Sequence, residues 1–227
     1  MRAAFAAVQK TEDTHKPNAY LVGVIVLSEL FKRYPIDPGY QKFMRQKADL
    51  FVMGLLKEPS LKMAHKNWAT YQDKQRIKAV KKIMQLQSQV FSGPHFAFED
   101  FTWGGLDNDP RSAVVAEFRG DKLFFNKGHK SSSWNDFPLT SQFAFHEGTH
   151  DMLDQVTEAF LNGELPATSV FYQQAKLLAD LRMPSGADIY INYREHVEAN
   201  RNHPEERDVH SLQRYIARVF SSATPQA

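Results

Sequence analysis

The chain has 227 residues, of which 42% are hydrophobic and 24% are charged, and 28 basic side chains nearly balance 26 acidic ones. The resulting formal net charge of +2 gives no electrostatic reason to expect nucleic acid or an anionic membrane as a partner. Because the chain has no cysteine, disulfides and cysteine-ligated zinc are excluded. The length is sufficient for one sizeable core, and the composition leaves the oligomeric state unknown.

The N-terminus does not have the pattern of a signal peptide. The apolar run at residues 21–27 is too short to span a bilayer, and Ser28 and Glu29 follow it directly. We therefore expect no transmembrane segment. The expected location is cytoplasmic, or outside the cell by an export route that uses no signal peptide.

The first part of the chain has the pattern of a helical region. Apolar side chains recur with helical spacing over residues 18–33, 39–57 and 59–91, and the last of these stretches is either one long helix or two shorter ones. The lysines from Lys74 to Lys82 favour a solvated face over a binding patch. The sequence predicts a helical N-terminal region over residues 1–92.

The pattern changes after this helical region. Residues 95–103 alternate between apolar and polar side chains, as in a half-buried strand. Two further strand patterns, at 111–119 and 122–126, flank Gly120-Asp121, which is a two-residue hairpin signal. We expect a small antiparallel sheet directly before the next helix.

The segment His146-Glu147-Gly148-Thr149-His150 has the spacing H-E-x-x-H. On a helix, residues four apart share one face, so both imidazoles can point at one metal ion. Glu147 lies one step around the helix, where it can hold a metal-bound water and accept its proton. The segment predicts a zinc site, with Zn²⁺ as the cofactor of a hydrolase.

The residues around this segment are typical of a buried helix. Pro138 precedes two candidate N-cap hydroxyls, Thr140 and Ser141, and Asn162-Gly163 is a C-terminal stop signal. Apolar side chains occupy much of the circumference between these ends. Buried histidine and glutamate side chains need polar partners, and a metal ion satisfies them.

The third metal ligand must come from elsewhere, because no histidine follows at the short spacing of the extended motif. On the helical segment at 189–201, His196 lies on the apolar face, whereas Glu195 and Glu198 lie toward the charged face. We rank His196 first as the third ligand, Glu195 second as its alternative and Glu198 third. Helical patterns on either side of this segment cover residues 166–182 and 205–220.

A developing oxyanion needs a hydrogen-bond donor besides zinc. Tyr193 lies one turn before the first-ranked ligand on the same face, which makes it the first candidate for this catalytic role, and Tyr190 and His210 are two others. Asp154 lies four residues beyond His150 on the metal helix. It either orients that histidine or is an ordinary solvated side chain.

Two short motifs, the H-E-x-x-H segment and His196-Val-Glu-Ala199-Asn200, resemble those of the zincin metallopeptidases over roughly residues 96–200. In the gluzincin branch the third ligand is a Glu on a later helix, three residues before an Ala. The position that corresponds to this ligand is His196. The resemblance implies a zincin-like catalytic region over residues 93–227, with an edge strand that borders the cleft and pairs with extended substrate.

The predicted class is therefore α+β, mostly helical, with the N-terminal region and the catalytic region forming one compact unit. The predicted function is zinc-dependent hydrolysis of amide bonds by a metallopeptidase acting on a peptide or protein, with Glu147 as general base. Two alternatives stay open. One is a zinc amidase or toxin effector acting on cell-wall peptide, and the other is a non-catalytic binding protein with a zincin shape.

Overall fold

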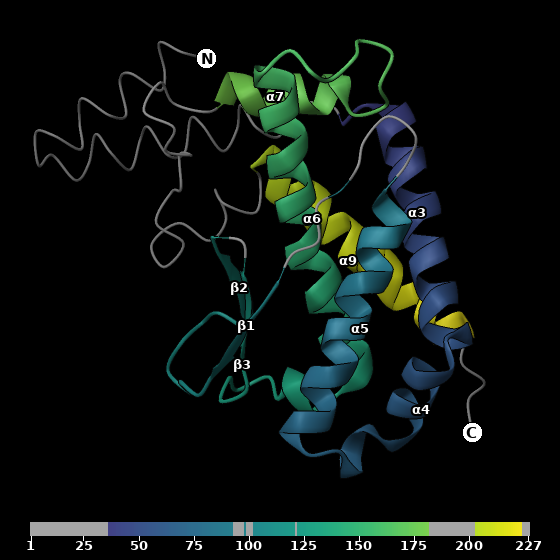
Figure 1. The fold of residues 1–227 in the computed structure, drawn as a ribbon, viewed down its shortest axis with the longest axis vertical. Coiled ribbons are helices and arrows are strands. Elements are labelled where there is room, and N and C mark those ends of the chain that lie inside the picture. Colours follow the sequence, from purple (N-terminus) through teal and green to yellow (C-terminus); the bar gives the residue numbers. More distant parts are fainter. Residues whose placement is uncertain (1–35, 93–97, 99–101, 121, 182–202, 224–227) are drawn as a thin grey trace, which may run out of the picture.

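The computed structural model describes residues 36–92, 98, 102–120, 122–181 and 203–223. The fold is α+β and mostly helical, as the sequence predicts, and α6 runs through its middle with the sheet on one side and α3 and α5 on the other (Figure 1). The elements are α3 (Pro38–Lys57), α4 (Pro59–Asn67), α5 (Asp73–Phe91), β1 (Thr102–Asp107), β2 (Ala116–Arg119), β3 (Lys122–Asn126), α6 (Phe137–Leu161), α7 (Tyr172–Leu181) and α9 (Pro204–Ala223).

Most of the described helices match their predicted ranges, but the helix predicted at 166–182 begins only at Tyr172, as α7. The stretch predicted at 59–91 forms two helices, α4 and α5, which are separated by a short 3-10 turn at Trp68–Thr70. The last helix, α9, begins one residue before its predicted start. The helices predicted at 18–33 and 189–201 lie outside the described residues. Among the residues that are described, no helix combines the length and the apolar character that crossing a bilayer requires.

The N-cap of α6 is Asp136, whose carboxylate accepts a hydrogen bond from the backbone N–H of Leu139 at 2.8 Å. The N-cap predicted at Thr140 or Ser141 is therefore wrong, and both hydroxyls donate to backbone carbonyls inside the helix or just before it. The proline two residues after Asp136 is tolerated only in the first turn, so the cap has to precede it. At the other end, Gly163 has a φ of 74° and ends the helix as predicted.

The sheet has the strand order β1-β3-β2 and is only partly antiparallel. Strands β2 and β3 form the predicted antiparallel hairpin, and Gly120 in its turn has a φ of 68°. The prediction of a wholly antiparallel sheet is wrong for β1, which pairs with β3 in parallel. This strand spans Thr102–Asp107 and so overlaps the strand predicted at 95–103 only at its end. Side chains alternate in the same way in both kinds of pairing, so the sequence pattern could not give the strand direction.

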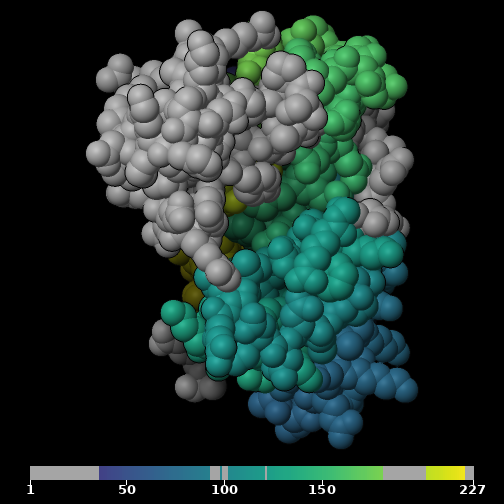
Figure 2. Space-filling model, turned by 90° about the vertical axis from the view of Figure 1, so that its left-hand side faces the viewer, coloured from purple at the N-terminus to yellow at the C-terminus, as the bar shows by residue number. Residues whose placement is uncertain are grey.

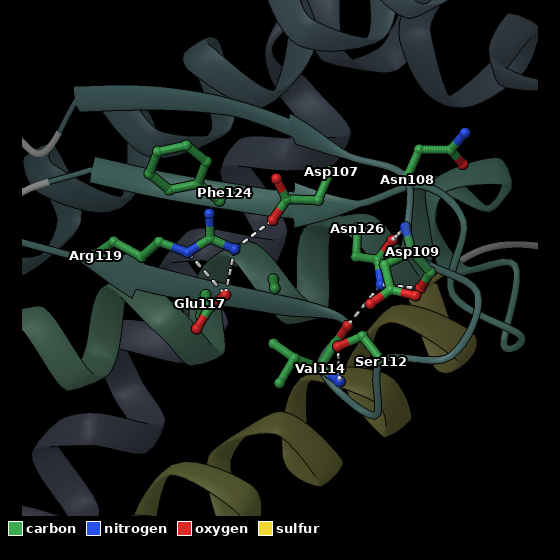
Figure 3. Close-up of a pocket in the computed structure, with 10 residues that line it drawn as sticks. Asp107, Asn108, Asp109, Ser112, Val114, Glu117, Arg119, Phe124 and Asn126 are labelled. Atoms are coloured by element: carbon green, nitrogen blue, oxygen red, sulfur yellow. Dashed lines mark hydrogen bonds and ion pairs between the residues drawn. The ribbon is translucent and has the colours of Figure 1, made fainter.

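The loop that joins β1 to β2 is held by Asn126 at the end of β3 (Figure 3). The side-chain amide of this buried residue donates to the carbonyls of Asp109, at 2.8 Å, and Val114, at 3.2 Å. Its oxygen accepts from the backbone N–H groups of Asp109 and Gly128. These bonds keep residues 111–115 in a loop, so β2 begins later than the predicted start at 111.

The core places α6 against α3 and α5 through aromatic contacts. The ring centroid of Phe145 lies 4.7 Å from that of Phe51 and 5.4 Å from that of Phe91. The fully buried side chain of Gln87 on α5 donates a hydrogen bond to the carbonyl of Phe145 at 2.9 Å. A Cβ atom on Gly148 would lie only 2.4 Å from Oε1 of that same amide. The glycine of the H-E-x-x-H segment therefore allows α5 and α6 to approach this closely.

We expect Gly148→Ala to lower the free energy of unfolding by about 1–3 kcal/mol, because the added methyl group displaces the buried Gln87 amide. The same substitution in an open helix raises stability by about 0.5–1 kcal/mol. In a Gln87→Ala background, where the space is free, the substitution should therefore become neutral or stabilising. Urea denaturation of the two single variants and the double variant measures this coupling, and additive effects would contradict it.

Candidate metal centre

Helices α6 and α9 bring three metal-binding side chains to one point, His146 and His150 from α6 and Glu206 from α9. The Nε2 atoms of the two histidines are 3.2 Å apart. The carboxylate oxygens of Glu206 lie 3.7 Å from Nε2 of His150 and 4.0 Å from Nε2 of His146. Ligand atoms from all three side chains thus lie within 4.8 Å of one another.

These separations suit a zinc ion. Bonds of about 2.0–2.1 Å in tetrahedral geometry place neighbouring ligand atoms about 3.3–3.4 Å apart. The observed separations of 3.2, 3.7 and 4.0 Å need only small side-chain shifts to reach that value. Two imidazoles and one carboxylate also form a donor set that catalytic zinc sites use, with a fourth position left for water or substrate. The residues present therefore fit a zinc ion.

The other ring nitrogens of the two histidines are held by α9. Nδ1 of His150 lies 2.5 Å from Oε1 of Glu205, and Nδ1 of His146 lies 3.2 Å from Oε1 of Gln213. An oxygen acceptor at Nδ1 places the proton on that nitrogen of a neutral imidazole and leaves Nε2 as the ligand atom. Both contacts therefore orient the Nε2 atoms toward the common point.

Two hydrogen bonds to α3 fix the position of α9. The hydroxyl of Tyr40, which is fully buried, donates to Oδ2 of Asp208 at 2.5 Å. Further along the helix, the hydroxyl of Tyr215 donates to Oδ1 of Asp49 at 2.9 Å. The apolar face of α9 is buried as well, through Val209, Leu212, Ile216 and Phe220. The first turn of α9, which carries the two Glu residues, is thus held in place from α3.

Burial and neighbouring charges set the protonation of the three candidate ligands. Burial and the charge of His150 lower the pKa of His146 to about 3. Burial raises the pKa of Glu206, but its contacts with His150 and His146 outweigh this and lower the pKa to about 2. Burial lowers the pKa of His150, but Glu205 and Glu206 outweigh it and raise the pKa well above its usual value. At neutral pH His146 is therefore neutral and Glu206 ionised, whereas the raised pKa of His150 favours its protonated form, which has to release a proton before Nε2 can bind a metal.

Glu147 lies beside this group, with Oε1 at 4.0 Å from Nε2 of His146. Its carboxylate accepts a hydrogen bond from the backbone of Phe118 on β2. Burial raises the pKa of Glu147 to about 8, and the charges of Glu206 and Glu117 add to the increase while His150 opposes it. The carboxyl group of Glu147 thus lies between β2 and the candidate ligands. It can reach a molecule bound at the candidate metal centre or along β2.

A cleft of about 640 Å³ opens onto these residues between β2, the loop before it, α6 and α9. In Figure 2 the yellow surface of α9 is set back behind the teal surface of the sheet. The cleft is large enough for several side chains of a bound peptide. Its lining residues are Ala113–Phe118, Gly120, Phe143, His146, Glu147, His150, Asp151, Asp154, Glu205, Glu206 and His210.

The structure brings His146, Glu147 and His150 together as the motif predicts. His196, Glu195 and Glu198 lie outside the described residues, as do Tyr190 and Tyr193, so their predicted roles stay predictions. Of the other candidates, His210 lines the cleft with its ring centroid 4.9 Å from that of His146, and its Nε2 is 3.5 Å from Oε2 of Glu206. Asp154 lies on the cleft wall.

Glu205 and Glu206 were not among the residues that the sequence predicts for the site. Their only local signal is a pair of acidic side chains in the first turn of a predicted helix. This pair is common at helix N-termini because it interacts favourably with the helix dipole. In addition, the residue three places after Glu206 is Val209 and not the Ala of the gluzincin pattern. The role of the pair emerges only from the packing of α9 on α6.

Comparisons of the chain with protein-family models, with curated proteins and with solved structures give no match.

We expect Glu206→Ala to lose bound zinc, as His146→Ala and His150→Ala should, because two remaining ligands hold zinc too weakly to survive dialysis against a chelator. Metal content of the purified variants measures this. The matched control is Glu158→Ala, an exposed carboxylate on α6 that should leave zinc content unchanged. If Glu206→Ala keeps stoichiometric zinc while His196→Ala loses it, the ligand set built on α9 is wrong.

We expect Glu205→Ala to retain the site but to bind zinc about 10–100-fold more weakly, because Nδ1 of His150 loses the acceptor that orients its ring. Competition with a chelating dye gives the zinc Kd. Circular dichroism before the titration checks that the variant is folded. An unchanged Kd in a folded variant would show that this contact does not support the metal.

Proposed function

We propose that the protein is a zinc-dependent hydrolase that cleaves peptide bonds, with His146, His150 and Glu206 as zinc ligands and Glu147 as general base. The observation that carries the proposal is the convergence of these four side chains on one cleft. Zinc held by the three ligands would supply a Lewis acid that polarises the substrate carbonyl and makes water more acidic. Three protein ligands leave one coordination position open, as catalysis requires.

Glu147 supplies the proton transfers. Its Oε1 lies close enough to the candidate ligands to accept a proton from the attacking water once the carboxyl group is ionised, and the positive charge of a bound zinc ion would lower its raised pKa toward that form. The same carboxyl group can then deliver that proton to the leaving amine nitrogen, since it faces the cleft in which the substrate lies. His210 lies in the same cleft, and its ring N–H is a candidate donor to the developing oxyanion.

The edge of β2 supports an extended peptide as substrate. The backbone N–H of Asn126 donates to the carbonyl of Val115, so in this antiparallel pair Glu117 and Arg119 also direct their backbone groups at β3. Ala116 and Phe118 alternate with them and direct their backbone groups away from β3.

The backbone of Phe118 donates a hydrogen bond to Glu147, which lines the cleft. This bond agrees with backbone groups of Phe118 that point away from β3 and into the cleft. An extended peptide in the cleft can therefore pair with the backbone groups of Ala116 and with the carbonyl of Phe118, which would bring its scissile bond to the candidate zinc site. The same arrangement favours peptide cleavage over the two alternatives. A non-catalytic binding protein needs no carboxyl group at the position of Glu147, and a compact cell-wall amide makes little use of an open strand edge.

We expect Glu147→Gln to keep its zinc and its fold but to lose hydrolysis by about 10²–10⁴-fold, because the amide cannot take a proton from water. Cleavage of an unstructured protein by the zinc-loaded variant, followed by mass spectrometry, measures this. Metal content serves as the control in the same preparation. Activity within about tenfold of the wild type would rule out Glu147 as the base.

A further inference from the structure

A groove of about 520 Å³ lies between α4 and α5, two neighbouring helices in the lower part of Figure 1. It shares no lining residue with the cleft of the candidate metal centre. Helix α5 lines one side with Lys78, Lys81 and Lys82, the lysine wall, and α4 lines the other with Met63 and Ala64, the apolar wall. Binding in this groove therefore does not depend on the proposed hydrolysis.

The lysine wall carries positive charge that the described part of the chain does not neutralise. Lys81 and Lys82 lie three and four residues after Lys78 on one face of α5, a spacing at which like charges repel each other and weaken a helix. Lys78 and Lys81 are exposed, and among the described residues neither has an ion-pair or hydrogen-bond partner. A ligand with negative charge would relieve this repulsion.

The acidic residues near the lysine wall have other partners. Helices α4 and α5 contain one acidic residue, Asp73, whose carboxylate lies 2.7 Å from Nζ of Lys127. Glu58, at the N-cap of α4, accepts a hydrogen bond from the hydroxyl of Ser60 at 2.5 Å, which lowers its pKa, and the charge of Lys82 adds to this effect. Of the lysine wall, only Lys82 therefore has a described carboxylate in its surroundings.

The apolar wall is open to solvent as well. Met63 is 55% exposed, the largest exposed fraction of any large hydrophobic side chain in the described part of the chain. Ala64 beside it and Ala79 on α5 are small and buried, which leaves room in the groove for a side chain from outside. Methionine is flexible and polarizable, and it is enriched where proteins bind partners. The lysine run alone favours a solvated face, but a groove with a second, apolar wall favours a binding site.

We propose that this groove binds an acidic segment of a partner protein, in which carboxylate and apolar side chains alternate. Lys78 and Lys82 are four residues apart, so they lie about 6 Å apart along the axis of α5. In an extended peptide, side chains two residues apart point to the same side and lie about 7 Å apart. Two alternate carboxylates can therefore pair with the lysine wall, while the apolar side chain between them points the other way and packs on Met63.

The two walls together favour a protein segment over other anionic partners. A nucleic acid brings phosphates to the lysines but no aliphatic side chain to cover Met63. An anionic membrane surface can approach the exposed ends of the lysines, but it cannot follow a groove between two helices. The formal net charge of +2 also provides no general attraction to either of these polyanions.

The test uses the full-length protein with Glu147→Gln, so that the proposed hydrolysis cannot consume a peptide, and three fluorescein-labelled peptides. The first contains Glu-Leu-Glu-Leu-Glu between Gly-Ser ends, the second has Gln in place of Glu, and the third has Ser in place of Leu. Fluorescence anisotropy at low ionic strength gives the Kd of each. We expect the first to bind about tenfold more tightly than the second, because exposed charge pairs each contribute a few-fold. The third should also bind more weakly than the first.

The variant Lys78→Gln/Lys81→Gln in the same background should bring the Kd values of the first and second peptides to within about twofold of each other. The matched control is Lys62→Gln/Lys66→Gln, which removes the same charge from two exposed lysines of α4 that do not line the groove. It should leave the preference for the first peptide within about twofold of its original value. Circular dichroism checks that both variants are folded. Met63→Ala should reduce the difference between the first and third peptides.

Equal Kd values for the first and second peptides, or a preference that survives in folded Lys78→Gln/Lys81→Gln, would overturn the site. A single-stranded oligonucleotide and vesicles that contain an anionic phospholipid are measured in parallel. If either binds more tightly than the first peptide and loses its binding in Lys78→Gln/Lys81→Gln, a protein segment is the wrong occupant. Weaker binding of both, together with the expected peptide preference, supports the acidic segment.

Discussion

The contact between α6 and the first turn of α9 sets the position of every group in the candidate metal centre. Helix α6 carries two histidines on the face that meets α9 and a glutamate that lies between them and β2. Polar groups in such a place destabilise the fold unless they have partners. Glu205 and Glu206 are those partners in the structure, and the same geometry also brings together the candidate metal-binding group. Here stability and the capacity for metal binding rest on the same contacts.

The helices of the N-terminal region hold this contact from outside. Tyr40 and Asp49, both on α3, bind α9 through hydrogen bonds that join residues more than 160 positions apart in the sequence. Gln87 on α5 binds the backbone of α6 within one turn of the metal-binding face. A change in the packing of α3 or α5 would therefore move α9 or α6, which carry the candidate ligands. The described helices of the N-terminal region thus help to position the candidate site through their contacts with α6 and α9.

The sheet forms the wall of the cleft that lies opposite α6 and α9. Because β3 lies at the centre of the sheet, β2 is left as an edge whose outward backbone groups face α6. Asn126 holds the preceding loop in place, so the wall extends beyond the short strand. The edge of β2 and the candidate metal centre on α6 and α9 thus line the same cleft.

The sequence by itself determined the α+β class, the hairpin of β2 and β3, the helices α3, α6 and α9, and the helical stretch that the structure divides into α4 and α5. Each of these depends on local spacing, turn residues or breakers that act within a few positions. It also placed His146, Glu147 and His150 on one helix, because i,i+4 geometry needs no tertiary information. The ligand helix predicted at 189–201 and its residue His196 lie outside the described residues.

Only the tertiary structure decided three further features: the parallel pairing of β1, the N-cap of α6 at Asp136 in preference to the nearby hydroxyls, and the arrival of Glu206 beside the two histidines. Strand direction leaves no trace in side-chain alternation, and several residues near a helix start can serve as its cap. A metal ligand contributed by a distant helix is fixed by how that helix docks. For α9 the docking is set by buried contacts to α3 and α6 that no local pattern in residues 204–223 encodes.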